Sequence, residues 1–418
     1  MNNTSLLIIN AGALINTQNP AEPLRSAAMQ EVPLIYNGWM LVRNGKIERI
    51  GAMQDLDCQG FPNDYAVWDA EGQWIFPSWC DSHTHLVFAA SREEEFVMKI
   101  KGMSYAEIAA RGGGILNSAR KLQQTSEDEL YILAEQRVRE LIGLGTGAIE
   151  IKSGYGLTVD AELKMLRVIK RLKENLPVLI KSTFLGAHAY PDAFRENHEG
   201  YLRMIEEDML PAIHAEGLAD YIDVFCEQGF FSNAETARLI EAGGKYGLSA
   251  KIHANQLSAS GAVETAVRYQ AVSVDHLETM NEPAIQALSG SPTIGTLLPT
   301  AAFFLRMDFQ PARTLLDRGC AIALASDFNP GSSPSGNMNL VVAMSCIQMK
   351  MLPEEAINAA TINGAFAMGL GKEAGSLAPG KWANFFITRP MSSLAYLPYA
   401  FGSHLIKKVM LRGQWQNV

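Results

Sequence analysis

The sequence is short of several residue types, and each shortage excludes a class of protein. Only five cysteines stand in 418 residues, widely spaced and without a Cys-x-x-Cys pair, which excludes a disulfide framework and indicates a reducing compartment. No run reaches the roughly 18 apolar residues that a membrane-spanning helix needs. No Lys or Arg precedes the short apolar stretch at the N-terminus, so we expect a strand there rather than a signal peptide. These absences predict a cytoplasmic protein without a membrane partner.

Positive charge is scarce as well. The chain has 35 Lys and Arg against 44 Asp and Glu, a net charge of -9, and no basic run alternates with aromatic residues. A nucleic-acid surface needs clustered Lys and Arg to meet the phosphates, so we expect no nucleic-acid partner. A hydrophobic content of 48% is instead typical of a globular α/β enzyme.

Short apolar runs alternate with helix-like amphipathic stretches through the middle of the chain. This alternation predicts strand–helix–strand units and a parallel sheet. Eight such units are the number in a (β/α)8 barrel, so we expect a TIM-barrel fold. The runs occupy residues 74–81, 147–154, 178–188, 221–229, 248–256, 271–278, 293–300 and 320–331.

The two ends of the chain have a different pattern. Residues 1–75 and 375–418 carry alternating apolar and polar residues around tight turns, which indicates short strands and hairpins. Hairpins are marginally stable alone and need a partner sheet. We therefore expect both ends to form one small, discontinuous β-sandwich beside a barrel domain of residues 76–374.

Polar residues stand where several of the apolar runs end. His83 and His85 lie one residue apart, and alternate residues of a strand share a face; His253, His276 and Asp327 end later runs. Each alone has a plainer interpretation, a core histidine or a helix-capping aspartate. The chain has only 8 histidines, however, and four fall at strand ends, which meet at the active-site face of a barrel. Three imidazoles and a carboxylate suit zinc or iron.

A catalytic ion of this kind also needs a water molecule and a proton acceptor. A bound ion can lower the pKa of its water to about 7, and a nearby base must take the proton and return it. Asp327 and His276 are both candidates for that base, and the sequence leaves the choice open.

The order of these residues resembles the amidohydrolase superfamily over essentially the whole chain, as do the flanking strands and the segment GSLAPGKWAN. The segments KSGYGL and DFNPGSSP further resemble its members that hydrolyse the ring amide of 4-imidazolone-5-propanoate to N-formimidoyl-L-glutamate in histidine degradation. The resemblance implies one zinc or iron ion per subunit. The implied metal ligands are His83, His85, His253 and Asp327.

The resemblance also implies roles around the ion. Asp327 would shuttle the proton to the departing ring nitrogen, and His276 would orient the water and stabilise the oxyanion. Arg92 would bind the substrate carboxylate, for which a forked guanidinium is well suited; the alternative is an ion pair with Glu93 to Glu95 on a solvated helix start. The remaining implied substrate contacts are Gln256, then Tyr105, Tyr155 and His188, each with a packing alternative, and Asn329, Gly331 and Ser332, for which a plain turn is the alternative.

Two positions differ from the family pattern, and they bear on the general base and on the number of metal ions. Gln256 stands where some relatives carry a carboxylate, and an amide cannot exchange protons, so base catalysis must fall to Asp327 or His276. No lysine ends the fourth run; Glu227 stands there, and we expect it to support the site rather than bind a second metal.

Other functions remain open at this point. The main alternative is a deaminase of a ring amidine or purine-like substrate with the same metal, and a remote one is a non-catalytic barrel scaffold, which should lack metal ligands. Arg92 and the DFNPGSSP loop favour an acidic small-molecule substrate. We also expect a homodimer.

Overall fold

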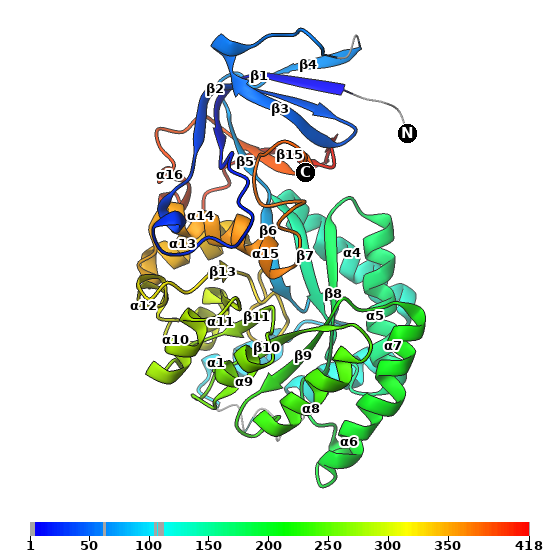
Figure 1. The fold of residues 1–418 in the computed structure, drawn as a ribbon. Helices are drawn as coiled ribbons and strands as arrows, with labels where there is room; N and C mark the ends of the chain where they lie inside the picture. The colour runs from blue at the N-terminus through cyan, green and yellow to red at the C-terminus, as the bar shows by residue number, and fades with distance from the viewer. Residues whose placement is uncertain (1–4, 62–63, 104–106, 108–112, 418) are drawn as a thin grey trace.

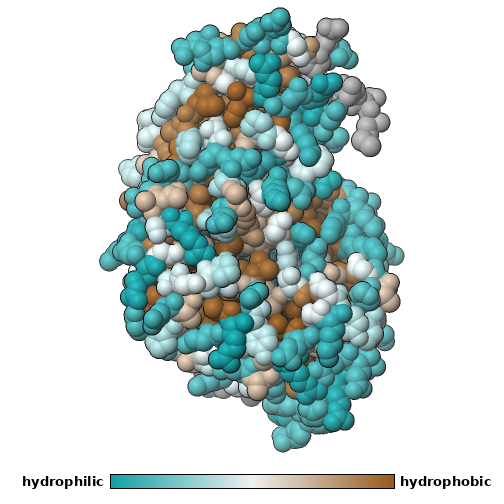
Figure 2. All heavy atoms as spheres, in the orientation of Figure 1, coloured by the Kyte–Doolittle hydropathy of each residue, from teal (hydrophilic) through white to brown (hydrophobic). Residues whose placement is uncertain are grey.

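The structure is a computed structural model that describes residues 5–61, 64–103, 107 and 113–417. Figure 1 shows two parts, a barrel of strands surrounded by helices and a smaller β-domain that contains strands from both ends of the chain. Among the described residues, no helix is long and apolar enough to cross a bilayer. Hydrophilic residues cover much of the face of the molecule seen in Figure 2.

The barrel is a sheet of eight parallel strands in sequential order from β6 to β13. Its ends are joined by a bridge between Thr84 and Phe328, and the His85 amide donates to the Phe328 carbonyl at 2.9 Å. The predicted (β/α)8 fold is therefore confirmed. The strands are β6 (Trp79–Thr84), β7 (Thr146–Lys152), β8 (Leu179–Ala187), β9 (Tyr221–Cys226), β10 (Ser249–Ala254), β11 (Ser273–His276), β12 (Ile294–Leu297) and β13 (Ile322–Leu324).

Helices surround the barrel, and side-chain caps begin several of them. Ser126 accepts from the Glu129 amide and Asn281 from the Ala284 amide, which satisfies backbone donors left free in a first helical turn. The helices are α1 (Glu93–Ile100), α3 (Ile115–Gln124), α4 (Glu127–Gly143), α5 (Val159–Asn175), α6 (His198–Met204), α7 (Leu210–Glu216), α8 (Asn233–Gly244), α9 (Ala262–Arg268), α10 (Glu282–Ser289), α11 (Pro299–Leu305), α12 (Ala312–Asp317), α13 (Met338–Met349), α14 (Pro353–Asn358), α15 (Gly364–Ala367) and α16 (Tyr396–Tyr399).

Shorter helical turns connect these elements. The 3-10 turns are η1 (Ser26–Gln30), η2 (Met53–Asp55) and η3 (Asp192–Phe194), and the π-helical turns are η4 (Ile205–Met209) and η5 (Ala359–Asn363). Both π-turns continue directly from an α-helix, where single π-turns are commonly found.

The smaller domain is one mixed sheet built from both ends of the chain, in the order β16-β15-β14-β5-β1-β2-β3 with β4 beside β1. It has a hydrophobic cluster of its own that includes Ile8, Met40 and Phe385. A second β-domain from both termini is therefore confirmed, whereas its sequence boundaries stay a prediction. Its strands are β1 (Ser5–Ile15), β2 (Leu34–Arg43), β3 (Lys46–Ala52), β4 (Tyr65–Asp69), β5 (Trp74–Pro77), β14 (Phe385–Thr388), β15 (Ile406–Leu411) and β16 (Gln414–Trp415).

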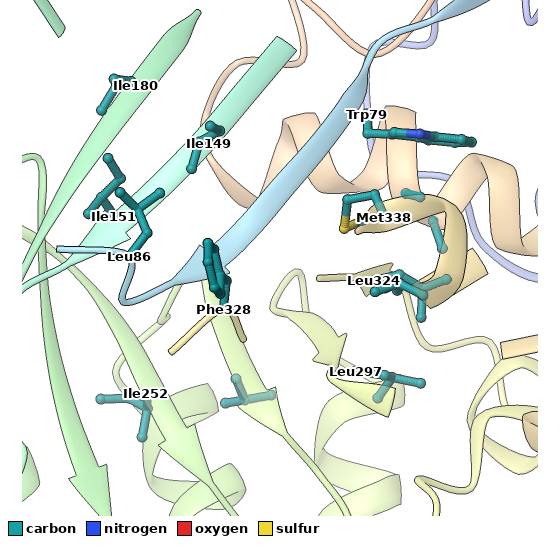
Figure 3. Close-up of a cluster of buried hydrophobic side chains, with 14 of the residues drawn as sticks. Trp79, Leu86, Ile149, Ile151, Ile180, Ile252, Leu297, Leu324, Phe328 and Met338 are labelled. Carbon is teal, nitrogen blue, oxygen red and sulfur yellow. The ribbon is translucent and has the colours of Figure 1, made fainter. Parts of the chain in front are cut away.

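Apolar side chains fill the barrel wall and join it to the smaller domain. Figure 3 shows some of these buried side chains, among them Trp79 at the start of β6 and Leu324 on β13. The Phe386 ring of β14 stacks on Phe76 at 5.3 Å and contacts Trp79 at 5.0 Å between centroids. Burying large rings from both domains in one contact gives each domain a fixed place against the other.

Candidate metal centre

Five polar side chains meet at the carboxyl ends of the barrel strands. His83 belongs to β6, His253 to β10 and His276 to β11, while His85 and Asp327 follow β6 and β13 closely. Each is at most 3% exposed. His276 and Asp327 have φ angles of 91° and 52°, in the left-handed region that costs a residue with a side chain about 1–3 kcal/mol. Such strain at a strand end is typical of functional sites, because the fold holds a side chain where the site needs it.

The distances among these groups match the edges of a coordination tetrahedron. His83 Nε2 lies 3.2 Å from His85 Nε2, which lies 3.3 Å from His253 Nε2. Asp327 Oδ1 lies 3.4 Å from His83 Nε2 and 3.6 Å from His85 Nε2. Four ligands placed tetrahedrally about 2.0–2.1 Å from one zinc ion would be about 3.3–3.4 Å apart. These spacings fit one ion held among His83, His85, His253 and Asp327, the ligands that the family resemblance implies. The metal-ligating atoms of the described residues fall into two groups that share His83, one with His85 and His253 and the other with His276 and Asp327.

Buried carboxylates orient two of the imidazoles. His83 Nδ1 lies 2.7 Å from Asp275 Oδ2, and His253 Nδ1 lies 2.9 Å from Asp223 Oδ2. A carboxylate that accepts from Nδ1–H leaves Nε2 unprotonated, which is the form that binds a metal. Lys152 lies below both carboxylates, 2.8 Å from Asp223 and 3.3 Å from Asp275, and compensates part of their charge.

The three candidate histidine ligands are held in the neutral form. Burial lowers the pKa of His83, His85 and His253 well below the ordinary value, and nearby positive charges lower it further. Neutral imidazole is the ligand form, so no proton has to leave these rings before an ion binds at neutral pH. The chemistry of the donor set, its spacing and its protonation all fit a borderline divalent ion such as zinc or iron.

Asp327 and His276 both have a raised pKa. Burial raises the pKa of Asp327 to about 6, against the opposing effects of His276 and of hydrogen bonds from Ser332 and Asn329. Burial alone would lower the pKa of His276, but Glu278, 3.4 Å from its Nδ1, and other carboxylates raise it. A group whose pKa lies near the working pH can both take and return a proton.

A cavity of about 480 Å³ opens over the metal centre. Its wall includes most of the side chains that the sequence suggested as substrate contacts, and it also includes apolar residues from several loops. Tyr105 lies outside the described residues. The suggested residues that line the cavity are Arg92, Tyr155, His188, Gln256, Asn329, Gly331 and Ser332.

Arg92 forms the ion pair that the sequence presented as one of two alternatives, and it also lines the cavity. Its Nε and Nη2 donate to Glu95 at 2.9 and 2.5 Å, so the ion pair at the start of α1 exists. The pair is not solvated, however: the Arg92 side chain is 7% exposed and lines the cavity. Glu95 therefore holds the guanidinium at the cavity wall.

His188 and Tyr155 form part of the wall beside the ligands. The His188 ring stacks on His85 with centroids 5.3 Å apart, and its Nδ1 lies 3.0 Å from the Gly154 carbonyl. Burial lowers the pKa of His188 to about 4. A neutral ring whose Nδ1–H is given to Gly154 leaves Nε2 as a hydrogen-bond acceptor.

The loop after β13 is folded around Asn329. The Asn329 Oδ1 accepts from the amides of Gly331 and Ser332, both at 2.8 Å, and the Ser332 hydroxyl donates to Asp327 at 3.1 Å. A Gly-rich turn of this kind can offer its backbone N–H groups to an anion, but here Asn329 already accepts from two of them. The loop instead fixes the orientation of the Asp327 carboxylate.

Glu227 supports the loop that carries Gln256. Its carboxylate accepts from the Leu257 amide at 2.9 Å, the Ser258 amide at 3.3 Å and the Ser258 hydroxyl. Neither grouping of metal-ligating atoms found in the described residues includes Glu227.

Sequence reasoning missed the layer beneath the ligands. Asp223, Asp275 and Lys152 are at most 1% exposed inside the barrel, and Lys99 lines the cavity. The available signal was a charged residue inside an apolar strand run, as in YIDVFC and SVDH, because a charge is buried only where it finds partners.

Comparison with known proteins places the chain among the amidohydrolases. The model of the amidohydrolase family matches residues 74–415. Solved structures with the same fold include a zinc-bound adenosine deaminase from Xanthomonas campestris (TM-score 0.70, 16% identity, 98% of this chain and 92% of that one). Another is E. coli guanine deaminase (TM-score 0.74, 14% identity, 98% of both chains). The chain belongs to the amidohydrolase family.

Curated relatives narrow this class further. The chain is 52% identical over 411 residues to the imidazolonepropionase of Flavobacterium johnsoniae, which covers 98% of this chain and 99% of the relative. It is 50% identical to the imidazolonepropionase of Christiangramia forsetii over the same shares. Within the amidohydrolases it is a member of the imidazolonepropionase family, and hence a hydrolase.

Proposed function

We propose that the protein hydrolyses the ring amide C–N bond of 4-imidazolone-5-propanoate and releases N-formimidoyl-L-glutamate. The observation that carries this proposal is full-length identity of 50–52% to imidazolonepropionases. A buried site with three imidazoles and a carboxylate at the required spacing supports it.

We assign His83, His85, His253 and Asp327 as the residues that hold one zinc or iron ion per subunit. When bound, such an ion polarises the substrate carbonyl and makes water nucleophilic at neutral pH. Asp275 and Asp223 then keep the imidazoles of His83 and His253 in the correct tautomer through their Nδ1 contacts.

His276 and Asp327 divide the proton chemistry. Glu278 and other carboxylates raise the pKa of His276, which favours the protonated ring, and in that form His276 donates a hydrogen bond to the carbonyl oxygen as negative charge develops there. Asp327, with a pKa raised to about 6, accepts a proton from the attacking water through its carboxylate. The same carboxyl group returns that proton to the departing ring nitrogen, which completes the amide cleavage.

The cavity wall positions the rest of the substrate. We assign Arg92 to the propionate carboxylate, because its guanidinium is fixed by Glu95 at the cavity wall. Tyr155, His188 and Gln256 border the space beside the ligands, where their polar atoms suit the nitrogen atoms of a five-membered ring. Tyr105, Asn329, Gly331 and Ser332 remain assigned to substrate contacts as well.

The basic side chains in the cavity favour this reaction over deamination of a neutral purine-like ring, and the complete ligand set argues against a non-catalytic scaffold. Arg92 and Lys99 both line the space, and the positive charge that they add beside Glu95 suits an acidic substrate better than a neutral base. We further propose a cytoplasmic homodimer.

Product analysis tests the proposed reaction. The purified, metal-loaded protein is given freshly generated 4-imidazolone-5-propanoate, and loss of its ultraviolet absorbance is followed together with the products. We expect N-formimidoyl-L-glutamate in equal amount to the substrate consumed and no ammonia. Ammonia release, or a substrate that stays intact, would contradict the proposal and favour deamination of another ring.

A further inference from the structure

Two basic side chains converge on Gly331 at one wall of the cavity. A Cβ added to Gly331 would lie 2.2 Å from Arg92 Nη1, and Lys99 donates from Nζ to the Gly331 carbonyl at 3.2 Å. Arg92 precedes α1 and Lys99 lies near its end, about two helical turns apart, so both side chains leave α1 on one face. We call Arg92, Lys99 and Gly331 the basic wall.

The two cations of the basic wall differ in how their charge is balanced. Arg92 donates twice to the Glu95 carboxylate. Within the described part of the chain, Lys99 forms no ion pair with a carboxylate; its Nζ donates to the Gly331 carbonyl and lies 5.7 Å from the centre of the Phe304 ring. Arg92, Lys99 and Glu95 together therefore carry one net positive charge beside the cavity, and one added carboxylate would balance it.

The surroundings of Lys99 make that charge costly without an anion. Burial lowers the pKa of Lys99, and the positive charge of Arg92 lowers it further against the opposing effect of Glu95. An ammonium group has three N–H donors, and the Gly331 carbonyl takes one of them. The two others are available for the oxygens of a carboxylate, which forms stronger hydrogen bonds with a charged donor than with a neutral one.

We propose that Lys99 is a specificity-determining residue that binds the substrate carboxylate together with Arg92. It thereby selects ring substrates with an anionic side chain over neutral rings of the same size. This inference rests on the proposed function, since it assigns a second contact to the propionate of that substrate. The competing interpretation is structural: Lys99 only fastens the loop after β13 to α1 through the Gly331 carbonyl.

Three variants separate these interpretations. Lys99→Met removes the charge at similar length, Lys99→Arg keeps it, and Lys101→Met removes an exposed lysine two residues away as a matched control. We expect Lys99→Met to raise KM for the imidazolone about tenfold with kcat within about twofold, as for loss of one partly exposed charged hydrogen bond. Lys99→Arg and Lys101→Met should both stay within about threefold of the parent KM.

A binding measurement distinguishes the two interpretations, because a purely structural role of Lys99 would not affect the preference for an acid over its neutral amide. Imidazole-4-propanoate and its neutral amide are titrated into the metal-loaded parent and variants by calorimetry. We expect the parent to prefer the acid and Lys99→Met to lose about tenfold of that preference, while Lys99→Arg retains it. If Lys99→Met weakens binding of the acid and of the amide equally, or leaves the preference unchanged, the proposal is overturned. Lys99 would then only hold the loop after β13 against α1.

The same experiment separates this inference from the proposed function. A parent protein that turns over the imidazolone, with an acid preference independent of Lys99, overturns the inference alone. A parent that does not turn it over, yet loses its acid preference in Lys99→Met, contradicts the proposed function and supports the carboxylate contact.

Discussion

The metal centre and the basic wall face one cavity but are built on different parts of the fold. The metal centre lies at strand ends, where each side chain is at most 3% exposed and two imidazoles have a buried carboxylate behind them. The basic wall stands on α1 and a loop, where Lys99 is only half-buried. The difference follows from what each must do, because bond-making needs positions held within about 0.5 Å, whereas attraction between charges tolerates more movement. We therefore expect changes at the metal centre to act on kcat and metal binding, and changes at the basic wall to act on KM.

The strongest test of the first half of this comparison is Asp327→Asn. The amide cannot accept the proton from water, so kcat should fall by at least about 10³-fold. Metal content, measured by mass spectrometry, separates loss of the ion from loss of the proton acceptor. Near-normal turnover by a metal-loaded Asp327→Asn protein would remove Asp327 from the mechanism.

Lowering the pH should destabilise the fold through the buried histidine beside the metal ligands. The pKa of His188 is about 4 in the folded protein because of burial, against about 6.5 in an unfolded chain. The unfolded chain therefore binds the proton first as the pH falls from about 6.5 to about 4, and the free energy of unfolding drops by up to about 3 kcal/mol over that window for this residue. Urea unfolding of the metal-free protein at several pH values measures the drop.

A matched pair of variants assigns that pH effect. His188→Gln removes one of the titrating groups and should reduce the dependence by that residue's share, while His83, His85 and His253, whose pKa values burial also lowers, keep the rest. His404→Gln, at an exposed position, should leave the dependence unchanged. A His188→Gln protein with the parent's full pH dependence would show that another group is responsible.

Asp275→Asn tests the layer behind the ligands. The change weakens the acceptor for His83 Nδ1, and partners of this kind typically contribute 10–100-fold to metal affinity. Competition with a chromophoric chelator should show a loss of about that size, with the exposed Asp317→Asn as control. Unchanged affinity would mean that the His83 ring is oriented by packing alone.

Arg92→Ala addresses the basic wall and should have the smallest effect on chemistry. We expect KM to rise about tenfold or more with a much smaller change in kcat, since the group it binds does not react. Steady-state kinetics over a wide substrate range measures both constants. A parent-like KM would place the substrate carboxylate elsewhere in the cavity.

The sequence predicted the barrel and the terminal domain because both rest on local patterns. Period-two alternation and short apolar runs mark strands wherever they occur, and polar residues at run ends mark the catalytic face. His83, His85, His253, His276 and Asp327 all follow from this rule, whereas the choice of four metal ligands among them came from the family resemblance. The structure groups the ligand atoms of His83 with those of His85 and His253, and also with those of His276 and Asp327.

The rest depended on contacts between distant residues. Asp275 reaches His83 across 192 positions of sequence, and nothing local distinguishes such a carboxylate from one that is merely tolerated. The surroundings of Lys99 depend on how α1 lies against the loop after β13, which periodicity does not specify. For Arg92, the ion pair with the neighbouring Glu95 could be predicted from the sequence. The burial of Arg92 could not, because it depends on tertiary contacts.

A metal titration tests the central claim most directly. The protein is stripped with a chelator, zinc or iron(II) is added back in fractions of an equivalent, and the rate of 4-imidazolone-5-propanoate hydrolysis is measured at each step. The account predicts no turnover without metal and a linear rise that ends at one equivalent per subunit. Full activity in the stripped protein, or a rise that continues to two equivalents, would contradict a single-metal site held by these four residues.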